Sequence, residues 1–197
     1  MAGTTGESPE PELLISQVRT DVSPRKGIVV IVIGLGANLP DSKGRPAAET
    51  LRAAISVLQA TTCFEFVAAS RLWETAPVPV SDQPWYVNAV MVARAKAPPA
   101  EILARLHGIE ADFGRVRLRR WEARVLDLDL LDADGLVTGA DQMEGLVLPH
   151  PRMADRAFVL RPLAEVAPGW RHPVSGESIA ALIDRLDPGQ ICRPLGD

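Results

Sequence analysis

The stretch 115–129 holds the residues whose types and spacing could do chemistry: five arginines, followed by Asp127 and Asp129. Apolar and acidic residues alternate from Arg124 to Leu131, which predicts a β-strand with both aspartates on one face, about 7 Å apart. Carboxylates bind hard divalent cations, and arginines bind phosphate oxygens in bidentate pairs. The pattern therefore indicates chemistry on a metal-bound polyphosphate.

The aspartate pair has a plainer interpretation, an edge strand that turns acids toward solvent. Aspartate is depleted in strands, however, and two on one face repel each other. A cation relieves that repulsion, so we interpret Asp127 and Asp129 as Mg²⁺ ligands. Two ions sharing such a pair would hold both the attacking and the leaving oxygen of a displacement.

The arginines of this stretch are Arg115, Arg117, Arg119, Arg120 and Arg124. They could form a solvated basic loop or contact an acidic partner. Their crowding beside two acids favours a phosphate clamp, with Arg115, Arg117 and Arg124 as its strongest members.

Further candidates lie on both sides of this stretch. His150 stands between two prolines and is either a structural turn residue or a donor to a phosphate oxygen, where Arg156 could join it. Asn88 and Tyr86 lie two apart on an expected strand, so they share a face that suits the polar edge of a heterocycle or simply packs.

Trp121 and Phe158 could enclose an aromatic ring, although as core residues they would be equally ordinary. The run Gly34-Leu35-Gly36 follows a β-branched strand but has neither a third glycine at dinucleotide-binding spacing nor a following Lys-Ser/Thr pair. We interpret it as a tight turn that opens a helix.

Hydrophobic periodicity defines the elements that must position these residues. Residues 1–26 are rich in Gly, Pro, Ser, Thr and Glu and are expected to form a flexible tail, with a single domain over 27–197. The expected strands cover 27–34, 64–73, 86–95 and 124–131, and the expected helices cover 47–60, 99–113 and 178–186. This β-α-β-β-α-β order predicts an α/β (α+β) fold with a ferredoxin-like core and long catalytic loops.

The bulk composition is that of an ordinary globular chain of 197 residues with a net charge of −4. An acidic balance argues against a general nucleic-acid coat. Two distant cysteines form neither a disulfide framework nor a metal motif. With no visible secretory signal and no apolar run long enough for a bilayer, the expected location is cytoplasmic, without a membrane partner.

Several motifs in a fixed order resemble the 6-hydroxymethyl-7,8-dihydropterin pyrophosphokinase family from about Ile28 to Ile183. They are Gly-x-Gly-Ala-Asn-Leu, Glu-Thr-Ala-Pro at 74–77, Asp-Gln-Pro-Trp-Tyr-Val-Asn-Ala at 82–89, Gly-Arg-Val-Arg at 114–117, Arg-x-x-Asp-Leu-Asp-Leu-Leu at 124–131, Leu-Pro-His-Pro-Arg-Met at 148–153 and Arg-Ala-Phe-Val-Leu-x-Pro-Leu at 156–163. Where the family usually shows Gly-Pro or Gly-Ala, this chain has Glu122-Ala123.

The resemblance implies an ATP-dependent enzyme that transfers pyrophosphate to the pterin hydroxymethyl group and releases AMP, with two Mg²⁺ on Asp127 and Asp129. The expected form of the protein is a monomer. It implies that the pterin contacts Thr75, Ala76, Pro77, Val78, Tyr86, Asn88, Trp121 and Phe158. It further implies that ATP contacts Arg115, Arg117, Arg124, His150 and Arg156, with Gln83 nearby.

Two other readings of the same sequence stay open. A ferredoxin-like sheet with basic and aromatic residues can bind single-stranded RNA, which calls for a basic domain with exposed aromatics, whereas this chain is acidic with 5% aromatic residues. The other is an inactive paralogue, which the retained aspartates and arginines disfavour.

Overall fold

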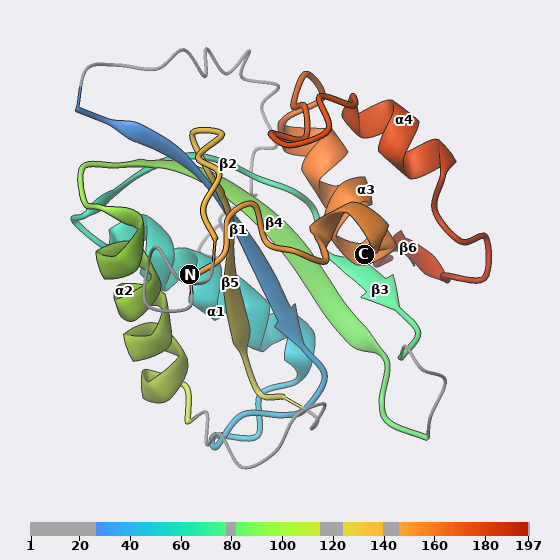
Figure 1. The fold of residues 1–197 in the computed structure, drawn as a ribbon. Helices are drawn as coiled ribbons and strands as arrows, with labels where there is room; N and C mark the ends of the chain where they lie inside the picture. The colour runs from blue at the N-terminus through green and yellow to red at the C-terminus, as the bar shows by residue number, and fades with distance from the viewer. Residues whose placement is uncertain (1–26, 78–81, 115–123, 140–145, 197) are drawn as a thin grey trace, which may run out of the picture.

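The computed structural model describes residues 27–77, 82–114, 124–139 and 146–196, and these form an antiparallel sheet with helices on both faces (Figure 1). The strands are β1 (Val29–Ala37), β2 (Phe64–Ala69), β3 (Trp73–Thr75), β4 (Tyr86–Ala95), β5 (Asp127–Ala133) and β6 (Cys192–Pro194). The helices are α1 (Ala47–Ala60), α2 (Pro99–Asp112), α3 (Ala157–Val166) and α4 (Ile179–Asp184), with a single 3₁₀ turn at Met153–Asp155.

The sheet has the strand order β5-β1-β4-β3-β6, and β2 also pairs with β4. Strand β1 is central, as its β-branched run predicts, and pairs antiparallel with β4 on one side and β5 on the other. Strands β2 and β3 pair with successive parts of β4. The short β6 pairs with β3 at the edge of the sheet.

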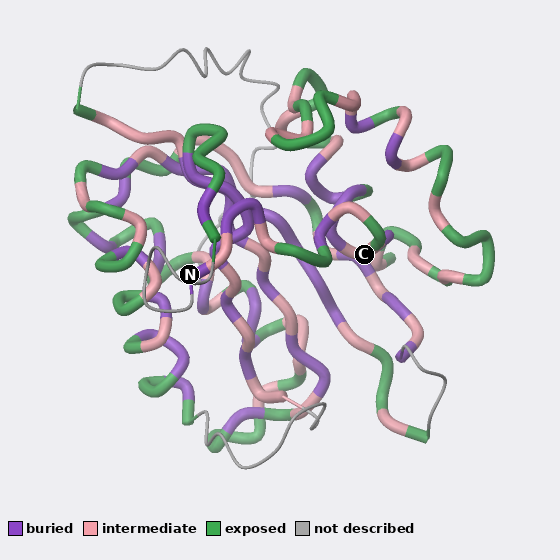
Figure 2. Tube along the Cα trace, in the orientation of Figure 1, coloured by how far each residue is buried: buried purple, intermediate pink, exposed green. Residues whose placement is uncertain are grey.

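Two apolar clusters pack on opposite faces of the sheet, which is the buried centre of the molecule (Figure 2). Strand residues such as Ile33 and Met91 pack with Leu51 of α1 and Leu106 of α2. On the other face Val90 belongs to the cluster that contains side chains of α3 and α4. The helices thereby form layers on both sides of a rigid sheet.

Helical and strand periodicity correctly predicted α1 and β4 to the residue, and α2 ends one residue before the expected position. Pro99 stands at the first turn of α2, where the missing N–H costs no helical hydrogen bond. The final helix is shorter than predicted, because Ser178 lies outside it as its N-cap and accepts a hydrogen bond from the Ala181 amide at 3.3 Å.

Three predictions about strands are wrong. The expected strand at 64–73 is two strands, because the chain leaves the sheet register at Ser70, whose hydroxyl accepts from the Val90 amide at 3.0 Å. The Gly34-Leu35-Gly36 run is no turn but part of β1, which continues to Ala37 because both glycines pair with β4 and β5. The aspartate strand begins at Asp127 rather than Arg124.

Among the described residues, no helix combines the length and apolar character needed to cross a membrane.

Candidate active site

Asp127 and Asp129 lie on β5 opposite the two glycines of β1, Gly36 and Gly34 respectively. Cross-strand partners share a face, so both carboxylates rise beside positions that carry no side chain. Gly36 also pairs with Asn88 on β4, and a Cβ added to it would lie 3.1 Å from the Asn88 Oδ1. Gly36 therefore keeps open the space between Asp127 and Asn88.

Basic side chains from three segments act on the aspartates. The Arg124 guanidinium forms an ion pair with Asp127. His150, Arg156 and Arg124 all act on Asp129, the charge of each lowering its pKa. Burial and the neighbouring Asp127 nevertheless dominate and raise the pKa of Asp129 above its usual value. The structure thus brings together five of the predicted phosphate and metal residues. The raised pKa of Asp129 shows that the charges around it do not fully stabilise its ionised form.

His150 is held in one orientation by the backbone. Its amide donates to the Leu131 carbonyl at 2.8 Å, and its Nδ1 accepts from the Arg152 amide at 3.3 Å. Burial lowers the pKa of His150, although the charge of Asp129 opposes this. Because Nδ1 is occupied as an acceptor, the ring N–H that can bind another group is the one on Nε2. That N–H is a donor of the kind predicted for a phosphate oxygen.

Arg156 lies just before α3 and its guanidinium carbon sits 5.3 Å from the Phe158 ring centroid. Burial lowers the pKa of Arg156, yet a guanidinium stays charged at neutral pH. The arginine candidate and the aromatic candidate of α3 are therefore direct neighbours.

Apart from Phe158 on α3, the described candidates for the heterocycle lie at or next to the paired ends of β3 and β4. Asn88 donates through Nδ2 to the Thr75 hydroxyl at 2.8 Å, and both side chains are buried. Ala76 and Pro77 follow directly after β3. Tyr86 donates to the Gln83 Oε1 at 3.3 Å, and burial raises the pKa of its hydroxyl. Val78, Arg115, Arg117 and Trp121 lie outside the described residues.

Sequence reasoning missed Asn38, a buried side chain that joins three segments of this region. Its Oδ1 accepts from the Arg124 amide at 2.7 Å, and its Nδ2 donates to the Gln83 Oε1 at 3.3 Å and the Pro84 carbonyl at 3.2 Å. The Asn38 amide also donates to the Arg124 carbonyl at 2.9 Å. The sequence offered one signal for this role, a polar residue at the end of a buried strand, because a buried polar side chain needs hydrogen-bond partners.

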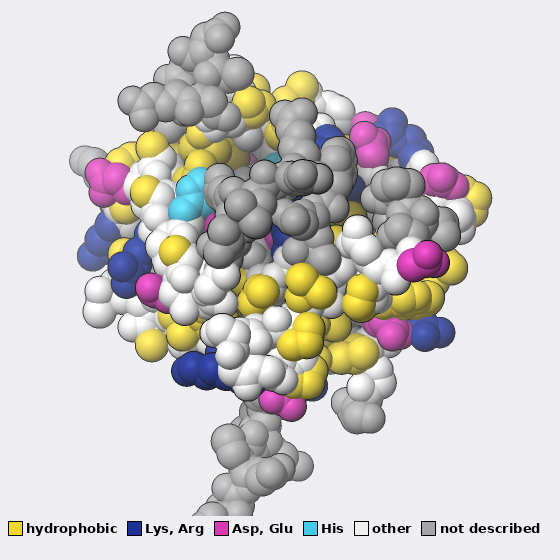
Figure 3. Space-filling view, turned by 90° about the horizontal axis from the view of Figure 1, so that it is seen from below, with side chains coloured by type: hydrophobic (Ala, Val, Ile, Leu, Met, Phe, Trp, Pro, Cys, Tyr) yellow, Lys and Arg dark blue, Asp and Glu magenta, His cyan; other side chains and the backbone are white. Residues whose placement is uncertain are grey.

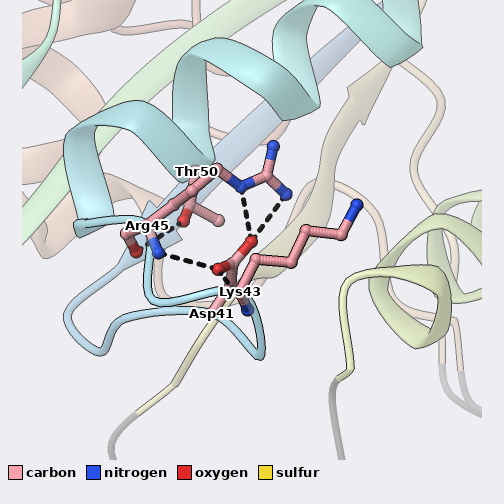
Figure 4. A network of polar contacts seen from close by, with 4 residues as sticks. All are labelled: Asp41, Lys43, Arg45 and Thr50. Atoms are coloured by element: carbon pink, nitrogen blue, oxygen red, sulfur yellow. Dashed lines mark hydrogen bonds and ion pairs between the residues drawn. The ribbon is translucent and has the colours of Figure 1, made fainter.

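The turn that follows Asn38 is held by Asp41 (Figure 4). Its Oδ1 accepts from the amides of Lys43 and Arg45, both at 2.9 Å, and its Oδ2 accepts from the Arg45 guanidinium at 2.6 Å. Burial acts to raise the pKa of Asp41, but these hydrogen bonds outweigh it and hold the pKa below its usual value. Arg45 also lies 5.5 Å from the Phe113 ring centroid, which ties the turn to the end of α2.

The carboxylates of Asp127 and Asp129 suit a hard cation whose remaining ligands are substrate phosphates and water. In the described part of the chain, no cluster of three or more His, Cys, Asp or Glu side chains could hold a metal alone. Magnesium commonly uses one or two carboxylates together with substrate phosphates and water. Asp127 and Asp129 fit that requirement, and the raised pKa of Asp129 is the kind of electrostatic cost that a cation offsets.

Comparison with known proteins agrees with this geometry. Residues 32–168 match the family model described as 7,8-dihydro-6-hydroxymethylpterin-pyrophosphokinase. The chain is 39% identical over 158 residues to a Synechocystis protein named 2-amino-4-hydroxy-6-hydroxymethyldihydropteridine pyrophosphokinase, covering 79% of this chain and 75% of that protein.

Proteins with the same name give similar matches in two further bacteria. The identity is 38% over 161 residues in Methylorubrum extorquens, which covers 82% of this chain and 96% of the relative. It is 37% over 140 residues in Haemophilus influenzae, which covers 71% of this chain and 82% of the relative. With the family model spanning both aspartates, His150 and Phe158, the chain belongs to the 7,8-dihydro-6-hydroxymethylpterin-pyrophosphokinase family.

Proposed function

We propose that this chain transfers pyrophosphate from ATP to the hydroxymethyl group of 6-hydroxymethyl-7,8-dihydropterin and releases AMP, a step of folate biosynthesis. The observation that carries the proposal is the convergence of Asp127 and Asp129 with Arg124, His150 and Arg156 on one face of the sheet. Such a set of two acids among cationic and N–H donors suits a metal-bound triphosphate.

In this proposal Asp127 and Asp129 hold two Mg²⁺ ions. When bound, magnesium neutralises phosphate charge and orients the phosphate oxygens. Arg124, His150 and Arg156 hold the triphosphate, and Arg115 and Arg117 join them. Phosphoryl-type transfer depends mainly on positioning and on charge stabilisation, so these residues supply most of the rate enhancement.

The pterin is proposed to lie at the ends of β3 and β4, between Asn88 and the ring of Phe158. Asn88 and Thr75 offer polar atoms to the heterocycle edge, while Phe158 and Trp121 offer ring faces. The other proposed contacts come from the segment after β3 and from the residues before and at the start of β4, namely Ala76, Pro77, Val78, Gln83 and Tyr86. Gln83 accepts hydrogen bonds from Asn38 and Tyr86, so we place it as a link between the two substrate regions.

A single assay tests the reaction class. The protein is incubated with MgATP and 6-hydroxymethyl-7,8-dihydropterin, and the nucleotide products are separated. We expect one AMP for each pterin diphosphate and loss of the reaction in excess EDTA. Formation of ADP would contradict pyrophosphate transfer, and absence of any pterin-dependent nucleotide cleavage would contradict the proposed function.

We also infer a ferredoxin-like core and a monomeric enzyme. The strand order supports the ferredoxin-like core. In a split β-α-β arrangement the third core strand lies between the first and the second. Here β4 is that strand, because it pairs antiparallel with β1 on one side and with β2 and β3 on the other. The monomer is an expectation that the described residues leave untested. Light scattering in solution tests the monomer, and a dimeric mass would overturn it.

A further inference from the structure

Residues 190–195, here called the 190–195 segment, run beside the elements that carry the described pterin candidates. In Figure 1 this segment follows α4 and includes β6, which pairs with the edge of β3 opposite β4 and lies close to α3. Sequence patterns did not predict β6, because three residues that include a proline carry no strand signal. Its contacts reach both sides of the proposed pterin site.

On one side, Gln190 binds the start of α3. Its Oε1 accepts from the Ala157 amide at 2.9 Å, and its Nε2 donates to the Asp155 carbonyl at 2.8 Å. The first amides of a helix lack intrahelical partners, and the N-cap residue Arg156 provides no side-chain hydrogen bond. Gln190 thus supplies the missing acceptor between Arg156 and Phe158.

On the other side, the segment binds the end of β3. The Ile191 carbonyl accepts from the Ala76 amide at 3.2 Å, and Cys192 pairs with Thr75 in the sheet. Thr75 in turn accepts the hydrogen bond from Asn88. The position of the Thr75–Ala76 backbone therefore depends on the segment.

Arg193 adds a third connection. Its Nε and Nη2 each lie 2.8 Å from the Glu74 Oε2, and its guanidinium carbon lies 5.1 Å from the Trp85 ring centroid. An exposed ion pair adds little stability by itself. Its geometric effect is to join β3 to the residue that precedes Tyr86.

We propose that the 190–195 segment is a positioning element for the pterin, with Gln190 as its main positioning residue. The proposal rests on the proposed function, because it assumes that Phe158 and Thr75 contact the pterin. The segment bonds to the backbone beside both residues, so it sets the distance between the ring face of Phe158 and the polar edge at Thr75. A flat heterocycle bound between them requires that distance to stay constant.

The test compares KM values for the two substrates in Gln190→Leu and Gln190→Glu. The leucine removes both hydrogen bonds, and we expect the KM for the dihydropterin to rise roughly three- to tenfold. The KM for ATP should change by no more than about twofold, because Arg156 is one of several phosphate contacts. Gln190→Glu keeps an acceptor for the Ala157 amide and should recover most of the lost pterin affinity.

Ser178→Ala is the matched control. It removes the N-cap hydrogen bond of α4, so it lowers stability by about as much as a lost cap usually does, without contacting β3 or the start of α3. Its KM for the pterin should equal that of the unmodified protein. Equal increases in Ser178→Ala and Gln190→Leu, or equal increases in both KM values of Gln190→Leu, would overturn the proposal.

Failures of the two proposals are distinguishable. If the unmodified protein turns over and Gln190→Leu keeps its pterin KM, the positioning role is wrong and the proposed function stands. If the unmodified protein releases no AMP, the proposed function is wrong, and the positioning role that depends on it is wrong as well. Should Gln190→Leu not fold, the exposed Arg193→Gln replaces it, with a smaller rise of the pterin KM expected and an unchanged pterin KM counting against the proposal.

Discussion

The ionised form of Asp129 is less favourable in the folded protein than in the unfolded chain. Because burial and Asp127 raise its pKa in the folded state, its contribution to stability is full below the unfolded pKa of about 3.9 and is lost as pH rises through the folded pKa. At neutral pH the ionised carboxylate therefore lowers the free energy of unfolding. A charge retained at such a cost is typical of a site that binds a cation.

We expect Asp129→Asn to separate stability from activity. The variant should unfold at higher urea concentration than the unmodified protein at pH 7. The difference should shrink toward about pH 3, because below the unfolded pKa of about 3.9 the aspartate is neutral in both the folded and the unfolded protein. AMP release should fall by roughly a hundredfold or more, since a metal ligand is lost. Equal stability differences at both pH values, or unchanged turnover, would contradict this assignment.

Asn38 is the second residue with a sharp prediction. Asn38→Ala leaves the Arg124 amide and the Pro84 carbonyl without their side-chain partner, so the free energy of unfolding should drop by about 1–3 kcal/mol. The value of kcat/KM should drop further than stability explains, because Arg124 and Gln83 both lose their alignment. Urea titration and steady-state kinetics measure the two effects.

Ser70→Ala provides the comparison for Asn38. Ser70 is also buried and forms two hydrogen bonds, to Val90 and to the Arg71 carbonyl, but it lies where β2 leaves the sheet register. We expect a similar stability loss with nearly normal kcat/KM. Parallel losses of activity in the two variants would show that Asn38 has no special role in positioning.

At the scale of elements, the two glycines of β1 lead to different predictions although they lie only two residues apart. A Cβ at Gly36 meets the Asn88 Oδ1 at 3.1 Å, and Asn88 is already held by Thr75. A Cβ at Gly34 meets the Leu131 Cδ1 at 3.2 Å, the far end of a flexible side chain. The first contact concerns the proposed pterin site, and the second concerns only the packing of a core residue.

Gly36→Ala should therefore raise the pterin KM by roughly tenfold, because the methyl group displaces the Asn88 amide from its hydrogen-bonded position. Gly34→Ala should cost about 1–3 kcal/mol of stability at most and change that KM by less than about twofold. Kinetics and urea unfolding of both variants provide the check. A larger pterin effect in Gly34→Ala would contradict the view that Gly36 keeps the floor of the site open.

At the scale of the whole molecule, the charges agree with a small-molecule enzyme rather than a polyanion-binding surface. The net charge is −4, and acidic and basic side chains are interspersed among apolar ones on the face in Figure 3. The basic groups that act on Asp129 are Arg124 just before β5, His150, and Arg156 just before α3. Positive charge is thus concentrated where the triphosphate is proposed to bind.

Removal of residues 1–26 should leave turnover within about twofold of the full chain, because their composition predicts a flexible tail without a packed core. Steady-state kinetics and thermal unfolding of the chain starting at Gly27 test this prediction. A loss of activity at constant stability would assign the 1–26 segment a role in the reaction.

The sequence by itself determined the longer helices and the strand β4, and it supplied the candidate residues for chemistry. Helical spacing of Leu51, Ala54 and Leu58 and the apolar run of β4 were sufficient to predict their bounds, because periodic burial of one face dominates long elements. The alternation at Asp127 and Asp129 predicted two acids on one face for the same reason.

Only the tertiary structure decided which candidates meet and what holds them. Asn38 binds Arg124 across 86 residues and Gln190 binds Ala157 across 33, and local periodicity carries no information about such contacts. The glycines of β1 were misread because their function depends on Asn88 and Leu131, which are remote in sequence. Local patterns follow from the geometry of one helix or strand, whereas the assembly of a site follows from which strands pair.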